Sequence, residues 1–338
     1  MIRVAIFNDS QTLRARLRAC LTRKEGFDVV LEAENGRASA SQVAKARAQL
    51  VLMDVIMPEV DGYAATRDIM NEHPVPIIIV TAALNPRDSA VIFRALAAGA
   101  LYVTSPPKPG EPLKQAAFLQ LLRATAGAKP QRSAKPIPEL RSTYPHPLRQ
   151  GTLSVIAVAT SAGGPQALTE ILQRLPASVL PPMLIVQHLS ANFDRSFAAW
   201  LSSETGHEVQ VARHGVPVEQ GAVYIAPNGL HLQWEAGHIA LSRQAPVGRF
   251  RPSATVLFES VAAAGAQALG IVLSGMGDDG AAGAKVLHDA GGRVIVQSRN
   301  SAAIWGMPGE VVRRGVSDAE LSTAEIAEAI RSMSGIRT

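Results

Sequence analysis

Residues 155–165 read Val155-Ile-Ala-Val-Ala-Thr-Ser161-Ala-Gly-Gly-Pro165, and this stretch decides how the second half of the chain folds. A run of β-branched and small apolar residues ends at Ser161, and apolar residues then recur at helical spacing through Leu175. The pattern predicts a strand, a tight turn and a helix. The serine hydroxyl would then lie clear of the sheet edge beside the first N–H groups of the helix, where it could attack an acyl carbon. An ordinary strand-to-helix connection or a phosphate loop has the same local pattern, so partner residues must decide.

The length and the cysteine content bound the class of protein. At 338 residues the chain is long enough for two domains, since one domain usually takes about 150 residues. Its single cysteine, Cys20, has no partner for an intrachain disulfide, which indicates a reducing compartment. No apolar run approaches the roughly 20 residues that span a bilayer, and we see no export signal. We therefore expect a cytoplasmic protein that does not insert into a membrane.

The positive charge is concentrated in one proline-rich stretch. The formal net charge is +5, and residues 123–150 contain six basic residues against one acidic residue. Five prolines in the same stretch favour an extended, solvated tether over a folded nucleic-acid-binding face. We expect no nucleic-acid partner. The predicted organisation is a first domain at 1–123, a basic linker at 124–150 and a second domain at 151–338.

The N-terminal half alternates apolar, β-type runs with segments of helical period. The runs cover residues 2–7, 29–31, 50–53, 77–80 and 101–103. Five βα units predict an α/β domain with a parallel sheet covered on both faces, a flavodoxin-like (βα)5 fold. Ligands of such a sheet bind where the strands end at their carboxyl edge.

Polar residues follow three of these strands. Asp9 comes after the first strand, Asp54 after the third and Thr81 after the fourth. Asp54 also begins the motif Asp54-Val-Ile-Met-Pro-Glu-Val-Asp-Gly62. Asp9 and Asp54 could hold one Mg²⁺ ion, which would offset phosphate charge as Asp54 takes a phosphoryl group. In the alternative interpretation, Asp54 only caps a loop.

With this motif, the N-terminal half resembles the receiver domain of two-component response regulators. The resemblance implies that Asp54 is the phosphoacceptor, that Thr81 is the hydroxyl that follows the phosphate and that a histidine kinase is the phosphodonor. Asn8 stands where receivers usually have the first of two adjacent acids, so Mg²⁺ should bind more weakly. Pro106 stands where they keep a phosphate-pairing lysine, and Lys108 lies two residues further on. A receiver that never takes phosphate therefore stays open as an alternative.

The C-terminal half contains a second alternating series. We expect strands at residues 153–159, 183–187, 223–226, 271–273 and 294–297, and an antiparallel hairpin that turns at Glu235-Ala-Gly-His238. Helical patterns fall between most of these strands. The series predicts a doubly wound α/β domain with a mostly parallel sheet.

Two further residues lie at strand ends of this second domain. His188 ends the run Leu184-Ile-Val-Gln-His188, and Asp279 lies in the turn Ser274-Gly-Met-Gly-Asp-Asp-Gly280. At the shared sheet edge, His188 could take the proton of Ser161 while Asp279 orients the imidazole. Taken singly, the histidine could be structural and the acids Asp278 and Asp279 could cap a helix. Together with the serine they predict a nucleophilic triad in an order that differs from α/β hydrolases.

Six motifs of this half resemble, in order, the methylesterase domain of CheB-type response regulators. They are Thr160-Ser-Ala-Gly-Gly-Pro165, Val186-Gln-His188, Tyr224-Ile-Ala-Pro-Asn-Gly-Leu-His231, Arg251-Pro-Ser253, Ser274-Gly-Met-Gly-Asp-Asp-Gly280 and Trp305-Gly-Met-Pro308. With a receiver in front, the whole architecture resembles that family of protein-glutamate methylesterases. The start Phe-Asn-Asp-Ser and the missing receiver lysine are most similar to its WspF-like branch, which serves surface sensing.

The resemblance implies a role for each residue of the site. Ser161 would be the nucleophile, His188 the general base and acid, and Asp279 the orienting carboxylate. The backbone N–H of Ala162 would donate to the oxyanion, although a threonine is usual at that position. Two further residues would face the substrate: Met276 would line the site and Arg251 would meet acidic receptor helices. Arg251 and His231 could instead support the fold.

The substrate that the resemblance implies is a glutamate γ-methyl ester on a chemoreceptor-type protein, hydrolysed to glutamate and methanol. The esterase would need no cofactor, and Mg²⁺ would serve only the receiver. Phosphorylation of Asp54 would activate the enzyme by weakening a docked state of the receiver. Two alternatives stay open. One is deamidation of receptor glutamines with release of ammonia, and the other is a catalytically silent adaptor that acts by docking alone.

Overall fold

The computed structural model describes residues 1–81, 89–128, 153–177, 180–189 and 193–334. The chain forms two compact units, Met1–Ile137 and Pro138–Thr338. Most of the predicted linker lies outside the described residues, so the tether stays a prediction. The last helix of the N-terminal unit continues to Ala126, three residues beyond the predicted domain end at 123. No helix in the described ranges is long and apolar enough to cross a membrane.

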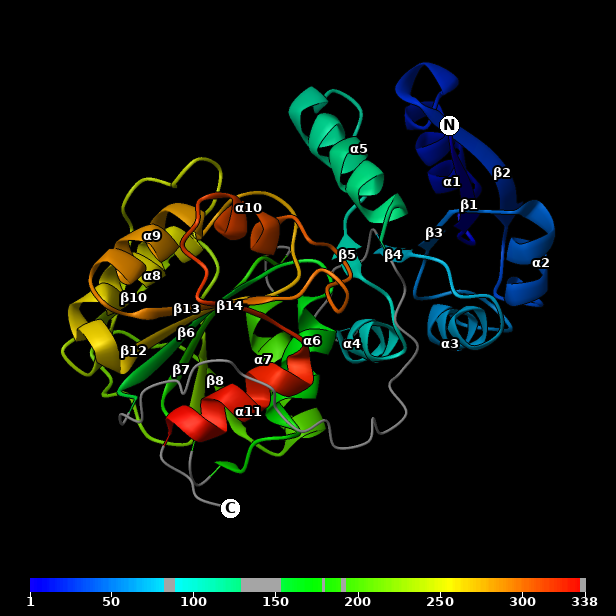
Figure 1. Cartoon of the computed structure of the whole chain (residues 1–338). Coiled ribbons are helices and arrows are strands. Elements are labelled where there is room, and N and C mark those ends of the chain that lie inside the picture. The colour runs from blue at the N-terminus through cyan, green and yellow to red at the C-terminus, as the bar shows by residue number, and fades with distance from the viewer. Residues whose placement is uncertain (82–88, 129–152, 178–179, 190–192, 335–338) are drawn as a thin grey trace. The chain divides into compact units, whose positions relative to one another are not determined.

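The described residues of the N-terminal unit form a five-stranded sheet in the order β2-β1-β3-β4-β5, and all of its strand pairs are parallel. The strands are β1 (Ile2–Phe7), β2 (Phe27–Ala33), β3 (Leu50–Met53), β4 (Ile77–Val80) and β5 (Tyr102–Thr104). The helices are α1 (Gln11–Cys20), the 3₁₀ turn η1 (Arg23–Glu25), α2 (Ser39–Ala46), α3 (Gly62–Glu72), α4 (Ser89–Ala97) and α5 (Pro112–Ala126). Helices cover both faces of the sheet (Figure 1). The predicted flavodoxin-like fold is confirmed.

The strand order of this unit places its polar residues together. From β1 the chain goes to β2 on one side and then returns to β3 on the other side, so the carboxyl ends of β1 and β3 flank a switch point. Asn8 and Asp9 follow β1, and Asp54 follows β3. Gly62 packs so close to this edge that a Cβ there would lie 1.9 Å from the carbonyl oxygen of Asp54. The Asp-Gly pair of the motif therefore lets α3 begin against the loop that carries Asp54.

The described residues of the C-terminal unit form a seven-stranded parallel sheet and a separate antiparallel hairpin. The strands of the sheet are β6 (Val155–Thr160), β7 (Met183–Gln187), β8 (Glu208–Val211), β9 (Ala222–Ile225), β12 (Ala268–Val272), β13 (Arg293–Gln297) and β14 (Ala319–Leu321). The hairpin is β10 (His231–Glu235) and β11 (His238–Ser242). The helices are α6 (Gly164–Leu172), α7 (Asp194–Thr205), α8 (Ala254–Val261), the 3₁₀ segment η3 (Ala262–Gln267), α9 (Ala281–Asp289), α10 (Met307–Arg313) and α11 (Thr323–Met333).

The order β14-β13-β12-β6-β7-β9-β8 again produces a switch point, here between β6 and β12. Helices α6, α7 and α11 lie on one face of the sheet, and α8, α9 and α10 lie on the other (Figure 1). Strands β6, β7, β9 and β12 are completely buried between these layers. The three strands β12, β6 and β7 are neighbours, and each leads into a loop with one residue of the predicted triad.

Two strands were not predicted from the sequence, β8 and β14. Both lie at the edges of the sheet. β8 reads Glu-Val-Gln-Val with only Val209 buried, and β14 has three residues. Short edge strands carry mixed polar residues because one side faces solvent, so they lack the apolar run by which a central strand is found.

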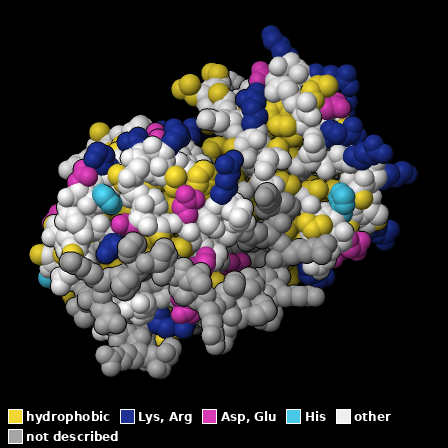
Figure 2. All heavy atoms as spheres, viewed as in Figure 1, with side chains coloured by type: hydrophobic (Ala, Val, Ile, Leu, Met, Phe, Trp, Pro, Cys, Tyr) yellow, Lys and Arg dark blue, Asp and Glu magenta, His cyan; other side chains and the backbone are white. Residues whose placement is uncertain are grey.

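Lys and Arg side chains are prominent on the face of the N-terminal unit shown in Figure 2, with acidic side chains among them. Several arginines of this unit are paired with acids: Arg14 with Glu34, Arg18 with Glu32, Arg23 with Asp28 and Arg37 with Glu59. This surface is therefore a mixture of both signs.

Candidate active site

The turn after β6 carries Ser161, which is 7% exposed. Gly163 has φ +79° and caps α6, which begins at Gly164. A Cβ on Gly164 would lie 2.0 Å from Oγ1 of Thr160 and 2.4 Å from Oε1 of Gln187. The turn can be this tight only because two glycines follow Ser161 and Ala162.

Ser274 fastens this turn to the loop after β12. Its carbonyl oxygen accepts hydrogen bonds from the N–H of Ser161 at 3.0 Å and from Oγ1 of Thr160 at 3.2 Å. Its hydroxyl donates to the carbonyl oxygen of Ala162 at 2.7 Å. At the next strand, Oε1 of Gln297 accepts the N–H of Ser274 at 2.8 Å. The serine turn is thus held by side chains as well as by the sheet.

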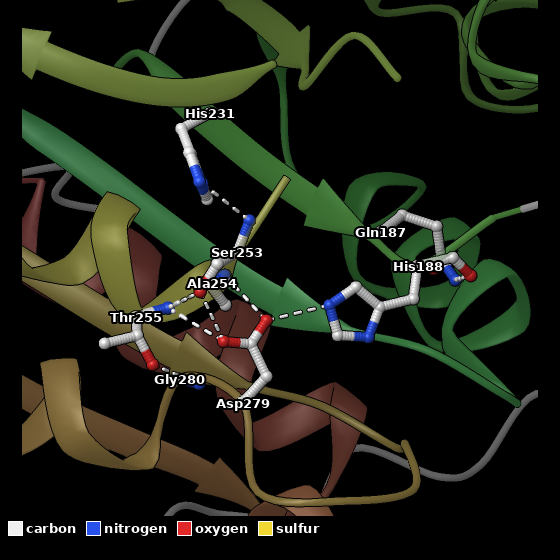
Figure 3. Close-up of polar contacts among 8 residues, drawn as sticks. All are labelled: Gln187, His188, His231, Ser253, Ala254, Thr255, Asp279 and Gly280. Carbon is white, nitrogen blue, oxygen red and sulfur yellow. Dashed lines mark hydrogen bonds and ion pairs between the residues drawn. The ribbon is translucent and has the colours of Figure 1, made fainter. Parts of the chain in front are cut away.

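The imidazole of His188 points from the end of β7 toward Asp279 (Figure 3). Nε2 lies 2.8 Å from Oδ2 of Asp279, and the two side chains are 9% and 1% exposed. Because Asp279 accepts from main-chain N–H groups as well, it is a carboxylate, and Nε2 must carry the proton. In the neutral ring Nδ1 is then the acceptor.

Four donors converge on the two carboxylate oxygens of Asp279 (Figure 3). Besides His188 they are Oγ of Ser253 at 2.6 Å and the N–H groups of Ala254 at 2.8 Å and Thr255 at 3.2 Å. Burial raises the pKa of Asp279, but the hydrogen bond and electrostatic attraction of His188, together with the hydrogen bonds from Ser253 and Ala254, outweigh it and lower the pKa below its ordinary value. Asp279 is therefore held as an anion in a nearly dry position.

Ser161 and His188 directly follow two neighbouring strands, β6 and β7, at the same level of the sheet. Thr160 and Gln187 are paired across β6 and β7, so the residue that follows each strand is Ser161 or His188. Gln187 bridges the two, since its Nε2 donates to the carbonyl oxygens of Ser161 at 2.9 Å and His188 at 3.2 Å. Within the described ranges, no hydrogen bond joins the Ser161 hydroxyl to the ring. Nucleophile–base contacts are often loose without substrate and tighten when it binds.

The remaining predicted site residues divide into two groups. The N–H groups of Ala162 and Met276 have no hydrogen-bond partner among the described residues, so both are available to an oxyanion. Arg251 and His231 instead contact the main chain of their own region. Nη1 of Arg251 donates to the carbonyl oxygens of Arg243 and Gln244 at 3.2 and 3.1 Å, and His231 is completely buried.

In the N-terminal unit, Asp54 is 9% exposed and its carboxylate accepts two close donors. Nδ2 of Asn8 donates to Oδ2 at 2.5 Å, and the N–H of Val55 donates to Oδ1 at 2.7 Å. Burial raises the pKa of Asp54 to about 6, with the Asp9 carboxylate adding to the rise, against hydrogen bonds from Val55, Ile56 and Thr81. The structure thus brings Asp9, Asp54 and Thr81 into one cluster.

Two positions that depart from the usual receiver pattern, Asn8 and Pro106, change the charge around Asp54. None of the groups with the largest effect on the pKa of Asp54 is a cation. Pro106 is buried, whereas Lys108 is exposed and its N–H donates to Glu111. Asn8 supplies an amide donor where an acid would have repelled Asp54.

The comparisons with known proteins follow the same division. The family model of the CheB methylesterase matches residues 156–330, and that of the response regulator receiver domain matches residues 4–117. A protein-glutamate methylesterase/protein-glutamine glutaminase of Anaeromyxobacter dehalogenans is 41% identical over 97% of this chain and 98% of its own length. The chain belongs to the CheB methylesterase family. It is a carboxylic ester hydrolase by that membership, with a receiver domain in front.

Other members of the CheB family agree over similar lengths. A relative named in the same way from Pseudomonas fluorescens is 38% identical over 91% of this chain and 92% of its own length. The crystal structure of the Thermotoga maritima CheB methylesterase catalytic domain aligns with a TM-score of 0.51 and 30% identity, over 53% of this chain and 98% of that domain. The predicted family and fold class are confirmed.

Several residues of the CheB-type site received no role of their own from the sequence, although two of them lie in the quoted motifs. Ser253 begins α8 and contacts Asp279, and a serine before an apolar helical run is the usual sign of a helix cap. Gln187 and Gln297 end buried strands, where a polar side chain is a signal that could have been used. No signal in the sequence pointed to Phe250, which lies on the imidazole of His188.

Proposed function

We propose that this chain hydrolyses γ-methyl esters of glutamate side chains on a chemoreceptor-type protein, with Ser161 as nucleophile. The observation that carries the proposal is the buried 2.8 Å contact between His188 and Asp279, one strand away from a serine on a tight turn. With Nε2 bonded to Asp279, Nδ1 is the free acceptor of the neutral ring.

We assign a residue to each step of the proposed reaction. Nδ1 of His188 takes the proton of Ser161 as the hydroxyl oxygen bonds to the ester carbon. Asp279 stabilises the imidazolium, and the N–H groups of Ala162 and Met276 donate to the oxyanion, each worth about 10²- to 10³-fold in rate. The proton then passes to the leaving methoxide, so methanol departs. Water hydrolyses the acyl-enzyme with His188 again as base, which releases glutamate and restores Ser161.

Deamidation of receptor glutamines is a second candidate for the same site. The relatives carry "protein-glutamine glutaminase" in their names beside the esterase activity. The chemistry differs only in the leaving group, which departs as ammonia after it is protonated by His188.

For the receiver we propose phosphoryl transfer from a histidine kinase to Asp54. Asp9 and Asp54 fit a Mg²⁺ ion, because carboxylate oxygens suit a hard cation and the charge of Asp9 already contributes to the raised pKa of Asp54. When bound, Mg²⁺ would offset the charge of the phosphoryl group. The hydroxyl of Thr81 lies within hydrogen-bond reach of Asp54 and would follow the phosphate. Phosphorylation of Asp54 would weaken the docking of the receiver on the esterase domain and so raise esterase turnover.

The proposed setting is the cytoplasm, with a membrane receptor as substrate and without a nucleic-acid partner. The receptor supplies the ester and the kinase supplies the phosphate. Membership in the surface-sensing branch of the family stays a prediction.

The test is release of methanol and ammonia from methylated, glutamine-containing receptor membranes by the wild type and by Ser161→Ala. We expect methanol from the wild type only. Ammonia released by the wild type but not by Ser161→Ala would establish the glutaminase as well. A Ser161→Ala variant that retains all function in cells would contradict the proposal and favour the silent adaptor.

A further inference from the structure

The segment 243–255, which runs from the end of the hairpin into the first turn of α8, is tied together at its base. Nη1 of Arg251 donates to the carbonyl oxygens of Arg243 and Gln244. The ring of His231 lies between the two arms, since Nδ1 is 3.2 Å from the N–H of Ser253 and Nε2 is 3.1 Å from the carbonyl oxygen of Ala245. Because an N–H can only donate and a carbonyl only accept, His231 is neutral with its proton on Nε2. These contacts give the segment a defined shape without any partner molecule.

The tip of the segment is a tight turn at residues 247–250. Val247 and Phe250 exchange two main-chain hydrogen bonds of 3.1 and 3.0 Å. The turn carries Phe250 onto His188, where the two rings stack with centroids 4.3 Å apart and planes 5° from parallel. The guanidinium of Arg249 also lies over the Phe250 ring, 5.2 Å from its centroid. Phe250 is therefore itself held in place.

The catalytic imidazole needs such a contact. Its hydrogen bond to Asp279 fixes the position of Nε2 but leaves the ring free to turn about the Nε2–Oδ2 direction. A parallel aromatic ring at van der Waals distance removes that freedom. It also covers one face of the imidazole, whose side chain is 9% exposed.

We infer that Phe250 is a positioning residue for His188, resting on the esterase proposed above. Phe250 sets the plane of the imidazole and so the direction of Nδ1 toward Ser161. The far end of the same segment holds Asp279 through Ser253, Ala254 and Thr255. One continuous segment thus orients both the base and its carboxylate. The face of Phe250 also attracts the imidazolium that forms when Ser161 loses its proton.

The test compares Phe250→Leu, which keeps an apolar side chain without a ring, with Phe250→Tyr, which keeps the ring. We expect Phe250→Leu to lower kcat for methanol release by roughly 10- to 100-fold with KM within about threefold of wild type, because a misdirected base affects the chemical step. Phe250→Tyr should restore kcat to within about threefold of wild type. Val247→Ala, at the exposed other end of the turn, is the matched control and should leave both constants unchanged.

The stack is read independently of turnover by proton NMR of the full chain, with the His188 resonance assigned from a His188→Gln variant. Ring current from Phe250 should shift the Cε1–H of His188 upfield in the wild type and in Phe250→Tyr, and Phe250→Leu should abolish the shift. Wild-type kcat in Phe250→Leu, or a raised KM at unchanged kcat, would overturn the inference. If the wild type released no methanol, the proposed function would fail, and absence of the upfield shift would then overturn the stack as well.

Discussion

Two buried carboxylates of this chain have opposite pKa shifts, and their neighbours explain the difference. Asp279 accepts from His188, Ser253 and two main-chain N–H groups, which outweigh its burial and lower its pKa. Asp54 also accepts hydrogen bonds, but burial dominates and the charge of Asp9 adds to it, so its pKa rises to about 6. The first group is suited to stabilise a cation beside it. The buried charge of Asp54 would be stabilised by a bound cation or removed by a new covalent bond.

The raised pKa of Asp54 predicts that the free energy of unfolding of the receiver depends on pH. An unfolded aspartate titrates near pH 3.9, so between about pH 4 and 6 the native chain binds more protons than the unfolded chain, and stability falls as pH rises. In Mg²⁺-free buffer Asp54→Asn should therefore be more stable than wild type at pH 7, by on the order of 2 kcal/mol, and should lose this advantage near pH 4. The stability difference between the two proteins is measured by hydrogen exchange of β1 and β3 peptides during urea unfolding of the full chain.

The control for that measurement is Asp68→Asn, which removes an exposed carboxylate of the same unit. Its stability relative to wild type should not change with pH over the same window. A constant difference between Asp54→Asn and wild type from pH 4 to 7 would show that Asp54 titrates normally.

Helix α8 acts as an anion site inside the protein. Its cap Ser253 and the first two N–H groups of the helix point at Asp279, where the positive end of a helix favours negative charge. Oγ of Ser253 also accepts the N–H of Thr255 at 3.2 Å. The cap therefore stabilises the helix and orients the carboxylate at once.

Replacing Ser253 should separate these two effects when it is compared with Ser260 on the same helix. Ser260 makes two hydrogen bonds, with Trp234 and Leu257, away from Asp279. Ser253→Ala should lower stability by about 0.5–2 kcal/mol as a lost cap and kcat by about tenfold as a lost donor to a charged group. Ser260→Ala should cost stability alone. Denaturant midpoints and methanol release measure both, and equal turnover of the two variants would contradict the role of the cap.

The central strands could be predicted from sequence because burial on both faces forces continuous apolar runs. The predicted strand boundaries at 2–7, 50–53, 77–80 and 183–187 agree with the structure to the residue. In a parallel sheet the strand ends meet at one edge, which is why Ser161, His188 and Asp279 could be grouped before any coordinates. Their roles stay predictions.

Contacts made by irregular segments could not be predicted. The turn at residues 247–250 has no periodicity, and its ring stack on His188 depends on how the segment is tied at Arg251 and His231. Arg251 was expected to face receptor, but the hydrogen bonds found for it go to the main chain of its own segment. Sequence reveals that a cation is present, whereas only the path of the backbone shows where its donors are used.

Both units of the chain place their site residues in the same way relative to the sheet. Both sheets place their reactive groups at a switch in strand order, between β1 and β3 in the receiver and between β6 and β12 in the esterase unit. A switch point opens a crevice where adjacent loops diverge, so polar groups gather there without disturbing the core. The chain therefore places the proposed phosphoacceptor Asp54 at one sheet edge and the proposed triad at the other.

We expect phosphorylation of Asp54 in the receiver to change the turnover of the esterase unit. Methanol release by the full chain should rise when a small-molecule phosphodonor and Mg²⁺ are added, since on our proposal phosphate on Asp54 would favour the released state of the receiver over the docked state. Asp54→Asn should abolish the rise. Initial rates with and without donor measure it, and equal rates for the wild type would remove the switch while leaving the esterase.

The central claim, that Ser161 and His188 act as one unit, is tested most directly by kcat/KM for methanol release in a double-mutant cycle. Ser161→Ala and His188→Ala should each lower it by roughly 10⁴-fold or more. The double variant should be no slower than either single variant, because each loss already disables the same step. Turnover retained in His188→Ala, or losses that multiply in the double variant, would contradict the account.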